Sequence, residues 1–274
     1  MIIKLGLKDI PPLTFAGLRY FIAFVSLLPF VFSRDKLAEI KSLDRDTWRK
    51  LVLLGIIFYT ATQGTQFIGL SLLPSVTVSL WLNFTPIIVA LLGIALLSEI
   101  PTKQQWIGTI LFFVGIIVYF FPIDLSGDQT LGLIVMTIGV LANSGSAILG
   151  RDINRSGKHH PFIVTTISMG IGAILLLVLG ITFQGLPTLN ITNIFYLLWL
   201  AIINTAFAFT LWNISLRTLT AMESSIINGT MLIQIAVLAW IFLGEVITTK
   251  EMIGMATAGL GALLVQLKVR SLQK

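Results

Sequence analysis

The chain has 274 residues, of which 56% are hydrophobic and 11% charged, with a formal net charge of +6 and no cysteine. A soluble domain carries about 25% charged residues, so this composition excludes an ordinary soluble fold. The lack of cysteine excludes a disulfide scaffold, thiolate chemistry and a Cys-ligated metal.

The chain begins with a short apolar segment, residues 2–7. This segment is too short to cross a bilayer and resembles the last turns of a helix whose beginning is absent. We therefore predict that Met1 is not the natural start or that the gene is truncated. The DNA upstream should then encode an in-frame apolar stretch of about fifteen residues.

Nine longer apolar runs follow, most of them near the roughly 20 residues that a helix needs to cross a bilayer. Hydrocarbon offers no partner to an open strand edge, so these runs are predicted to be helices. No stretch is long or polar enough for a separate soluble domain. The predicted spans are residues 13–32, 51–73, 76–97, 106–121, 131–149, 162–183, 194–216, 225–243 and 252–267.

Clusters of basic residues lie in alternate connections between these runs. Residues 73–75, 122–130 and 184–193, which lie between the basic connections, carry no lysine or arginine. This positive-inside pattern predicts a multi-pass protein of the cell membrane with a cytoplasmic C-terminus. Nucleic-acid binding needs basic residues on one folded surface, so no nucleic-acid partner is expected. The clustered residues are Arg34, Lys36, Lys41, Arg45, Arg49, Lys50, Arg151, Arg155, Lys158, Lys268, Arg270 and Lys274.

Two segments of the chain, residues 98–108 and residues 244–254, are similar and align without a gap. If the apolar start counts as a helix, each half holds five helices, and an odd number inverts the second half relative to the first. The sequence therefore predicts two inverted repeats, residues 1–122 and 130–268. The matched pairs, each 146 positions apart, are Glu99 and Glu245, Thr102 and Thr248, Ile107 and Ile253, Gly108 and Gly254, and Gly115 and Gly261.

On these motifs the chain resembles EamA-type members of the drug/metabolite transporter superfamily, over essentially its whole length. The resemblance implies an all-α, polytopic membrane protein with ten helices in two inverted EamA repeats, here with most of the first helix missing. In relatives that helix helps to line the central cavity. The resemblance also implies transport of amino acids or related compounds, with export as the expected direction. The matching residues are 10–20 (IPPLTFAGLRY), Thr85-Pro86, Leu97-Ser98-Glu99 with Gly108 and Gly115, and Leu243-Gly244-Glu245 with Gly254 and Gly261.

The repeated glutamates, Glu99 and Glu245, are candidates for coupling carboxylates, because acids within a membrane are usually functional. A structural role is favoured, since each lies in a turn just before a helix, where a carboxylate stabilises the positive end of that helix. Capping boxes also open these helices and a third one. The three predicted boxes are Thr102 with Gln105, Thr220 with Glu223, and Thr248 with Glu251.

Arg19 lies roughly 10 Å inside its span by helical rise. It either attracts an anionic substrate or extends to the outer membrane interface, and the sequence leaves both readings open. Several small residues are predicted to allow close helix packing rather than to form a dimerisation motif, which leaves open whether the protein forms a homo-oligomer. These residues are Gly132, Gly139, Gly254, Ala258 and Gly261.

Uncharged polar residues at membrane depth are the better candidates for a binding site, since each needs a partner or a wet cavity. Gln63 and Gln66 share a helical face, and Asn83 lies just before a predicted kink at Pro86. A second cluster occupies equivalent positions in the other repeat, and inversion places the two clusters on opposite sides of the midplane. Hydrogen bonding between packed helices is the alternative for any single residue. The predicted substrate-binding residues are Gln63, Gln66, Trp81, Asn83, Trp212, Asn213 and Asn228.

Enzyme signatures are missing from the sequence: it has no His-Glu-x-x-His, Gly-x-Ser-x-Gly or phosphate-loop motif, and no carboxylate pair at membrane depth. We therefore predict a carrier and not an enzyme, with no cofactor and no metal, that moves a small organic metabolite by alternating access. Apart from Arg19, no ionisable residue lies at mid-depth, which predicts neutral or zwitterionic substrates and no coupling to protons through a buried carboxylate. Uptake or exchange is the alternative direction. The alternative class is a non-transporting membrane protein, such as a lipid-handling or sensory scaffold.

Overall fold

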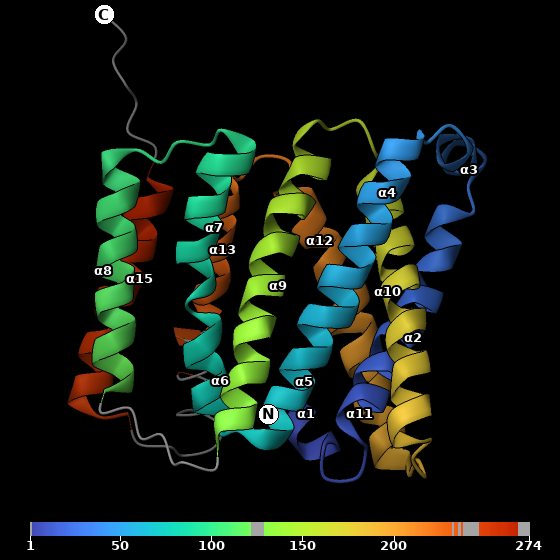
Figure 1. The fold of residues 1–274 in the computed structure, drawn as a ribbon, viewed down its shortest axis with the longest axis horizontal. Helices are drawn as coiled ribbons and strands as arrows, with labels where there is room; N and C mark the ends of the chain where they lie inside the picture. Colours follow the sequence, from blue (N-terminus) through green and yellow to red (C-terminus); the bar gives the residue numbers. More distant parts are fainter. Residues whose placement is uncertain (1, 122–128, 232, 235–236, 238–246, 268–274) are drawn as a thin grey trace, which may run out of the picture.

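The computed structural model describes residues 2–121, 129–231, 233–234, 237 and 247–267. In this part of the chain the elements are helices that stand side by side, as Figure 1 shows. Labels with η mark π-helical segments. The elements are α1 (Ile2–Gly6), α2 (Pro12–Val31), α3 (Arg34–Lys41), α4 (Arg45–Leu54), η1 (Gly55–Thr62), α5 (Gln63–Leu72), α6 (Ser75–Leu82), α7 (Thr85–Leu92), η2 (Gly93–Leu97), α8 (Lys103–Phe120), α9 (Thr130–Arg155), α10 (Pro161–Gln184), α11 (Ile191–Ala201), η4 (Ile202–Phe207), α12 (Ala208–Ser215), α13 (Ala221–Gly229) and α15 (Thr249–Gln266).

Seven helices of the described residues are long and apolar enough to cross a membrane, and they match the first seven predicted spans. The eighth predicted span, residues 225–243, begins in α13 and continues outside the described residues. The ninth corresponds to α15, an 18-residue helix. The predicted all-α, multi-pass membrane fold is therefore confirmed. The seven spans are Pro12–Val31, Arg45–Leu72, Thr77–Leu97, Lys103–Phe120, Thr130–Arg155, Pro161–Gln184 and Ile191–Ser215.

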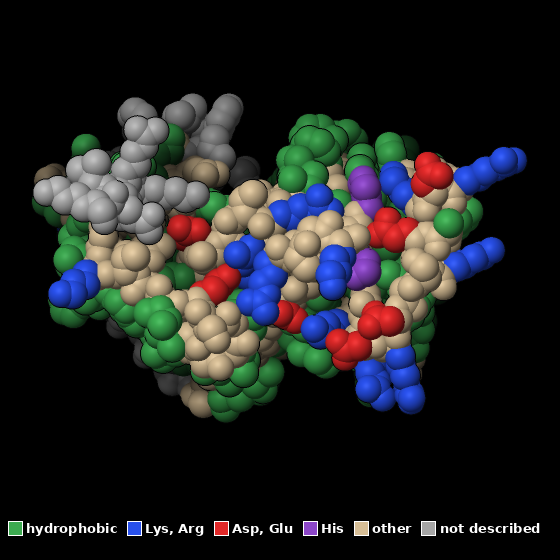
Figure 2. All heavy atoms as spheres, turned by 90° about the horizontal axis from the view of Figure 1, so that it is seen from above, with side chains coloured by type: hydrophobic (Ala, Val, Ile, Leu, Met, Phe, Trp, Pro, Cys, Tyr) green, Lys and Arg blue, Asp and Glu red, His purple; other side chains and the backbone are tan. Residues whose placement is uncertain are grey.

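The surface of the bundle has the polarity that a bilayer requires. Large apolar side chains such as Ile110, Val114 and Ile117 of α8 are about half exposed on its sides, which suits contact with lipid rather than water. Charged side chains gather instead on the end of the bundle at which α3 lies, as Figure 2 shows. The predicted basic tail and the acidic residues Asp124 and Asp128 lie outside the described residues.

Helices α8 and α15 pack closely along glycines and reveal the symmetry of the fold. A methyl group on Gly108 would lie 2.7 Å from the Gly261 carbonyl oxygen, and one on Gly115 would lie 2.6 Å from the Gly254 carbonyl oxygen. Gly108 and Gly254 are repeat mates, as are Gly115 and Gly261, so a two-fold rotation exchanges the two contacts. The helices run antiparallel, which is the inverted relation expected of the repeats. The predicted role of these small residues in close packing is confirmed.

The repeats also share their irregularities. The π-helical segment η1 covers residues 55–62, and the same place in the second repeat, 146 residues later, holds η4 at residues 202–207. Helix α6 ends in a turn at Asn83 and Phe84, and α13 ends at Gly229, the repeat mate of Asn83, before a turn at Thr230. The sequence predicts a kink at Pro86; the helix is interrupted just before it, at Asn83 and Phe84, and Pro86 lies in the first turn of α7.

Each half of the bundle combines helices from both repeats (Figure 1). One apolar core joins α2, η1 and α5 to α10, α11 and η4 around Phe15, Tyr20 and Phe67. A second core joins α6, α7 and α8 to α13 and α15 around Phe112 and Ile226. Helix α9 lies between the two groups and contacts α5 of one and α7 of the other. This arrangement brings equivalent segments of the two repeats into contact, and the candidate site lies among them.

Candidate functional site

The two helix breaks meet inside the bundle. The Asn83 side chain is 4% exposed, and its Nδ2 donates to the Ser79 carbonyl oxygen at 2.7 Å. Its Oδ1 is buried and has no hydrogen-bond partner in the described part of the chain. A methyl group on Gly229 would lie 3.1 Å from this oxygen, so the break that ends α13 lies directly against the break that ends α6. Broken helices that cross at a repeat interface are where secondary transporters place their binding sites.

Polar groups without partners continue along α13 from this crossing. Ser225, one turn before Gly229, is buried, and its Oγ has no hydrogen-bond partner among the described residues. Asn228 is exposed, and its side-chain amide likewise has no hydrogen-bond partner in the described chain. On α6, Trp81 is half-buried, and its Nε1 donates to Thr137 Oγ1 of α9 at 3.2 Å. The crossing therefore combines an aromatic wall with polar atoms that are free to bind a ligand.

Three of the predicted residues on α5 and α12 differ in burial but share unpaired polar groups. Gln63 is buried and Gln66 half-buried, and neither amide has a hydrogen-bond partner in the part of the chain that the structure describes. Trp212, the repeat mate of Gln66, is half-buried. Its Nε1 is likewise without a partner among those residues. These three side chains keep their full capacity for a ligand.

Asn213 is the exception among the predicted site residues. Its Nδ2 donates to Thr165 Oγ1 at 3.0 Å and to the Phe209 carbonyl oxygen at 3.1 Å. Its Oδ1 accepts a hydrogen bond from Asn154 Nδ2 at 2.7 Å. Its amide therefore ties α12 to α9 and α10, which is the packing role that the sequence left open for any single residue. The sequence alone does not point to Asn154, because its partner is 59 positions away.

Arg19 does not extend to the membrane interface, since it is only 7% exposed. Its Nε donates to Thr205 Oγ1 at 2.7 Å, and its Nη2 donates to the Asn204 carbonyl oxygen at 3.3 Å. Both acceptors belong to η4, where the wider π-helical turn changes the usual backbone pairing. Sequence reasoning found Arg19 and missed Thr205, which carries no signal except that it is the repeat mate of Tyr59.

Glu99 has a structural role that differs in detail from the predicted one. Its Oε2 accepts a hydrogen bond from the Ala221 backbone nitrogen at 2.9 Å, in the first turn of α13, and not from the helix that follows Glu99. Its Oε1 pairs with Arg151 Nε at 2.8 Å. The chain leaves η2 through Ser98 in the left-handed conformation (φ 56°), and this turn directs the carboxylate across to the other repeat. Its repeat mate, Glu245, lies outside the described residues.

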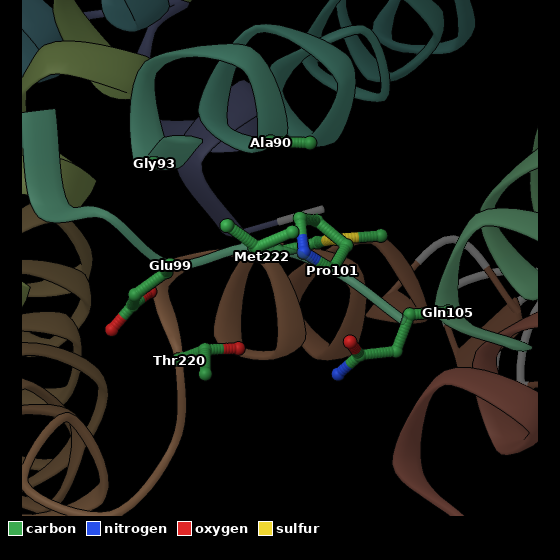
Figure 3. A pocket seen from close by; sticks show the side chains of 8 residues that line it. Ala90, Gly93, Glu99, Pro101, Gln105, Thr220 and Met222 are labelled. Carbon is green, nitrogen blue, oxygen red and sulfur yellow. The ribbon is translucent and has the colours of Figure 1, made fainter. Parts of the chain in front are cut away.

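The three predicted capping boxes are confirmed at the starts of α8, α13 and α15. Two of them are linked, because Gln105 Nε2 donates to Glu223 Oε1 at 3.2 Å. Beside this link is a pocket of about 100 Å³ that is lined by residues of α7, η2, α8 and α13 and of the turn that follows η2 (Figure 3). This pocket is smaller than the roughly 300 Å³ usual for ligand pockets, and the residues that line it belong to the joint between the repeats.

These features define a class of protein. Apolar helices of membrane length, inverted halves and broken helices that cross at the repeat interface are together the architecture of a secondary transporter. The sequence model described as the EamA-like transporter family matches residues 1–121 and 130–267. The chain therefore belongs to the EamA-like transporter family.

Individual relatives agree with this assignment. The chain is 24% identical over 257 residues to a protein of Bacillus subtilis (strain 168) named "Uncharacterized transporter YoaV", covering 92% of this chain and 86% of the relative. It is 25% identical over 215 residues to an "Uncharacterized transporter" of Archaeoglobus fulgidus, covering 77% of this chain and 72% of the relative. A solved crystal structure superposes with a TM-score of 0.78 at 15% identity, over 96% of this chain and 91% of that one, which supports the fold alone. The protein is a membrane transporter.

Proposed function

We propose that this transporter moves a small organic metabolite, an amino acid or a related compound, across the cell membrane by alternating access, with export as the physiological direction. The observation that carries the proposal is the contact between the two helix breaks, Asn83 against Gly229. Breaks at equivalent places in inverted repeats supply unpaired polar groups at mid-depth, and motion of one repeat against the other exposes such a site to either side.

The proposed binding residues come from the two helices of this crossing and from α5 and α12. Amide groups of Gln63, Gln66 and Asn228 supply hydrogen bonds, and the buried Asn83 Oδ1 accepts one from the substrate. Trp81 and Trp212 supply apolar walls. Asn213 supports the site by holding α12 in place, since its own amide is fully engaged.

Transport by purified protein in proteoliposomes tests the proposal. With a panel of labelled metabolites, we expect uptake of at least one amino acid or related compound. Gln66→Leu and Asn228→Leu should each lower that rate about tenfold or more, because each removes polar groups from the path without filling a packed contact. Ser71→Leu, an exposed change on the same helix as Gln66, is the matched control and should leave the rate unchanged. A panel without any transported compound would instead favour a non-transporting scaffold.

The proposed orientation puts the charged end of the bundle in the cytoplasm. Lysines and arginines gather on that end (Figure 2), as the positive-inside rule expects of a cytoplasmic face. Because the chain has no cysteine, Ser42→Cys and Thr188→Cys each give a single thiol at an exposed position on opposite ends. An impermeant thiol reagent should label only Thr188→Cys in intact cells, and labelling of Ser42→Cys would reverse the orientation.

We further propose that the substrate runs down its own gradient or exchanges, without proton coupling through a buried carboxylate. Among the Asp, Glu, Lys, Arg and His residues of the described spans, only Arg19 lies at mid-depth, where proton relays usually lie. An imposed pH gradient should therefore drive no accumulation of substrate. Accumulation that survives the combined Glu99→Gln, Glu223→Gln and Glu245→Gln changes would contradict this mechanism.

A further inference from the structure

Arg19 is a buried cation whose charge is not balanced by the part of the chain that the structure describes. It lies within the spanning helix α2 and is 7% exposed. None of the ion pairs of the described residues includes it. Its guanidinium carbon lies 5.3 Å from the ring centre of Tyr20 and 5.9 Å from that of Phe67, which stabilise a cation only modestly. An uncompensated charge at this depth would cost several kcal/mol, so Arg19 is suited to hold an anion.

The guanidinium group is held by one edge and leaves another edge available. Nε and Nη2 donate to η4, through Thr205 Oγ1 and the Asn204 carbonyl oxygen. Thr205 Oγ1 itself donates to the Leu200 carbonyl oxygen at 2.8 Å, which fixes its lone pairs toward Arg19. A guanidinium carries five N–H groups. The two on Nη1 and the second one on Nη2 have no acceptor among the described residues. Nη1 and Nη2 together form the fork that binds a carboxylate with two parallel hydrogen bonds.

Gln63 faces the same level of the bundle from the neighbouring helix. The ring centres of Phe15 and Phe67 are 5.4 Å apart, and those of Tyr20 and Tyr59 are 5.7 Å apart. These two pairs therefore mark two successive heights along the bundle at which α2 faces the helix formed by η1 and α5. Arg19 lies between Phe15 and Tyr20 on α2. Gln63 lies midway between Tyr59 and Phe67, about one turn from each. Its amide is unpaired within the described chain and so remains able to donate to a ligand held at this level.

We propose that Arg19, assisted by Gln63, binds the carboxylate of the substrate, and that the carrier therefore selects compounds with one carboxylate, amino acids among them. The inference rests on the proposed transport function. The available fork and the single unbalanced charge match a planar monoanion, whereas a dianionic phosphate would leave a buried negative charge. If Arg19 only closed the π-helical segment, a neutral donor would satisfy Thr205 and Asn204 without the cost of a buried cation.

Matched pairs of ligands test this assignment. The thermal unfolding midpoint of the purified protein is measured with each standard amino acid and with the corresponding amino-acid amide, which lacks the carboxylate charge. The same pairs of compounds are then tested as competitors of transport in proteoliposomes. Wild-type protein should be stabilised by at least one amino acid and not by its amide. Arg19→Gln should weaken apparent affinity for that amino acid roughly tenfold or more, because a charged hydrogen-bonded pair is lost. Arg19→Lys should fall between the two, since it keeps the charge and loses the fork.

Gln63→Leu is the second variant, in case Arg19→Gln does not fold, and it should weaken apparent affinity for the amino acid by a few-fold. Ser71→Leu should match wild type. Equal stabilisation by acid and amide, no stabilisation by any acid, or an unchanged acid preference in Gln63→Leu or a folded Arg19→Gln would overturn the assignment. Transport without a carboxylate preference would leave the proposed function standing and reject this inference. Carboxylate binding that depends on Arg19, without transport of any compound, would support this inference and reject the proposed transport function.

Discussion

The π-helical segments η1 and η4 occupy equivalent places in the two repeats, yet different interactions join each of them to the helix that packs on it. Helix α10 packs on η1 so tightly that a methyl group on Gly172 would collide with the Gly55 carbonyl oxygen, and Thr60 Oγ1 donates to the Gly172 carbonyl oxygen at 3.0 Å. Helix α2 packs on η4 through the guanidinium of Arg19. The same kind of helix contact, which we call a joint, therefore occurs in both repeats, and only the joint at η4 contains a charged side chain.

The difference begins at one position in the packing helix. Helices α2 and α10 both begin with a proline, and seven residues later they carry Arg19 and Ser168 respectively. The Ser168 hydroxyl is buried and donates to Val164 of its own helix, so it makes no demand on a ligand. The uncharged contact between α10 and η1 suits a fixed connection between helices, whereas the charged contact between α2 and η4 suits a binding site. Four predictions test this contrast, from the largest expected effect to the smallest.

Gly172→Leu should abolish stable folding, because the new side chain meets the backbone at Gly55 and neither helix can withdraw without exposing the core. Overpacking of this kind costs about 3 kcal/mol or more. The yield of monodisperse protein and its thermal unfolding measure the effect. Gly145→Ala on α9, where an added methyl group has no neighbour within 4 Å, is the matched control and should fold normally. Normal folding of Gly172→Leu would show that η1 is not a packed joint.

Thr205→Val should destabilise the protein by about 1–3 kcal/mol, because it leaves the buried Arg19 Nε without its acceptor. Thr60→Val removes a donor from η1, but the Gly172 carbonyl oxygen remains within helix α10, so we expect a loss below about 1 kcal/mol. Chemical denaturation in mild detergent compares the two variants. Only Thr205→Val should also weaken carboxylate binding, and equal effects on binding would remove the functional distinction between the joints.

Glu99→Gln should lower stability by roughly 1–2 kcal/mol without changing the preference for carboxylates. The pair of Arg151 and Glu99 is mostly buried, with side chains 13% and 17% exposed, so the lost charge is only partly screened. Arg151 thus differs from Arg19 in having its counter-charge within the described part of the chain. Arg151→Gln is the companion variant and should lower stability at least as much, because it also removes the hydrogen bonds from Nη1 to the Leu216 and Arg217 carbonyl oxygens. A changed ligand preference in either one would place a substrate charge at this joint as well.

Sequence alone was enough for those features that local patterns determine. Apolar runs located the spans, the 146-residue spacing located the inverted halves, and the Thr-x-x-Gln/Glu motifs located the helix starts. The π-helical segments were not predictable, because the inserted residue is stabilised by the helix packed against it and not by its own sequence. The environment of Arg19 was hidden for the same reason, since Thr205 is 186 positions away. Asn213 was assigned to the site because its type fits a cavity, and only its three hydrogen bonds separate it from Gln66.

The smallest predicted effect concerns the start of α10, the helix that closes η1. His160 Nδ1 accepts a hydrogen bond from the Phe162 backbone nitrogen at 3.3 Å, which requires a neutral imidazole. Partial burial, together with the charges of Lys36 and Arg217, lowers the pKa of His160 below its ordinary 6.5, and Glu39 opposes them in part. Because the folded pKa lies below the unfolded one, the stability from this cap is present above about pH 6.5 and is lost as the pH falls through the folded pKa.

We therefore expect the thermal midpoint of the wild type to fall between pH 7.5 and 5.5 by an amount equivalent to roughly 0.5 kcal/mol, since water replaces part of the lost cap at this exposed position. His160→Asn keeps an N-cap that does not titrate and should remove this part of the pH dependence. His159→Gln, which changes the neighbouring histidine that pairs with Glu39, is the control and should retain it. Helix α2 begins at Pro12, and its Leu13 backbone nitrogen donates to Gln184 Oε1 at 2.8 Å; this acceptor does not titrate, so no matching loss is expected beside η4. An unchanged pH dependence in His160→Asn would assign the acid sensitivity to another group and leave the two joints alike in this respect.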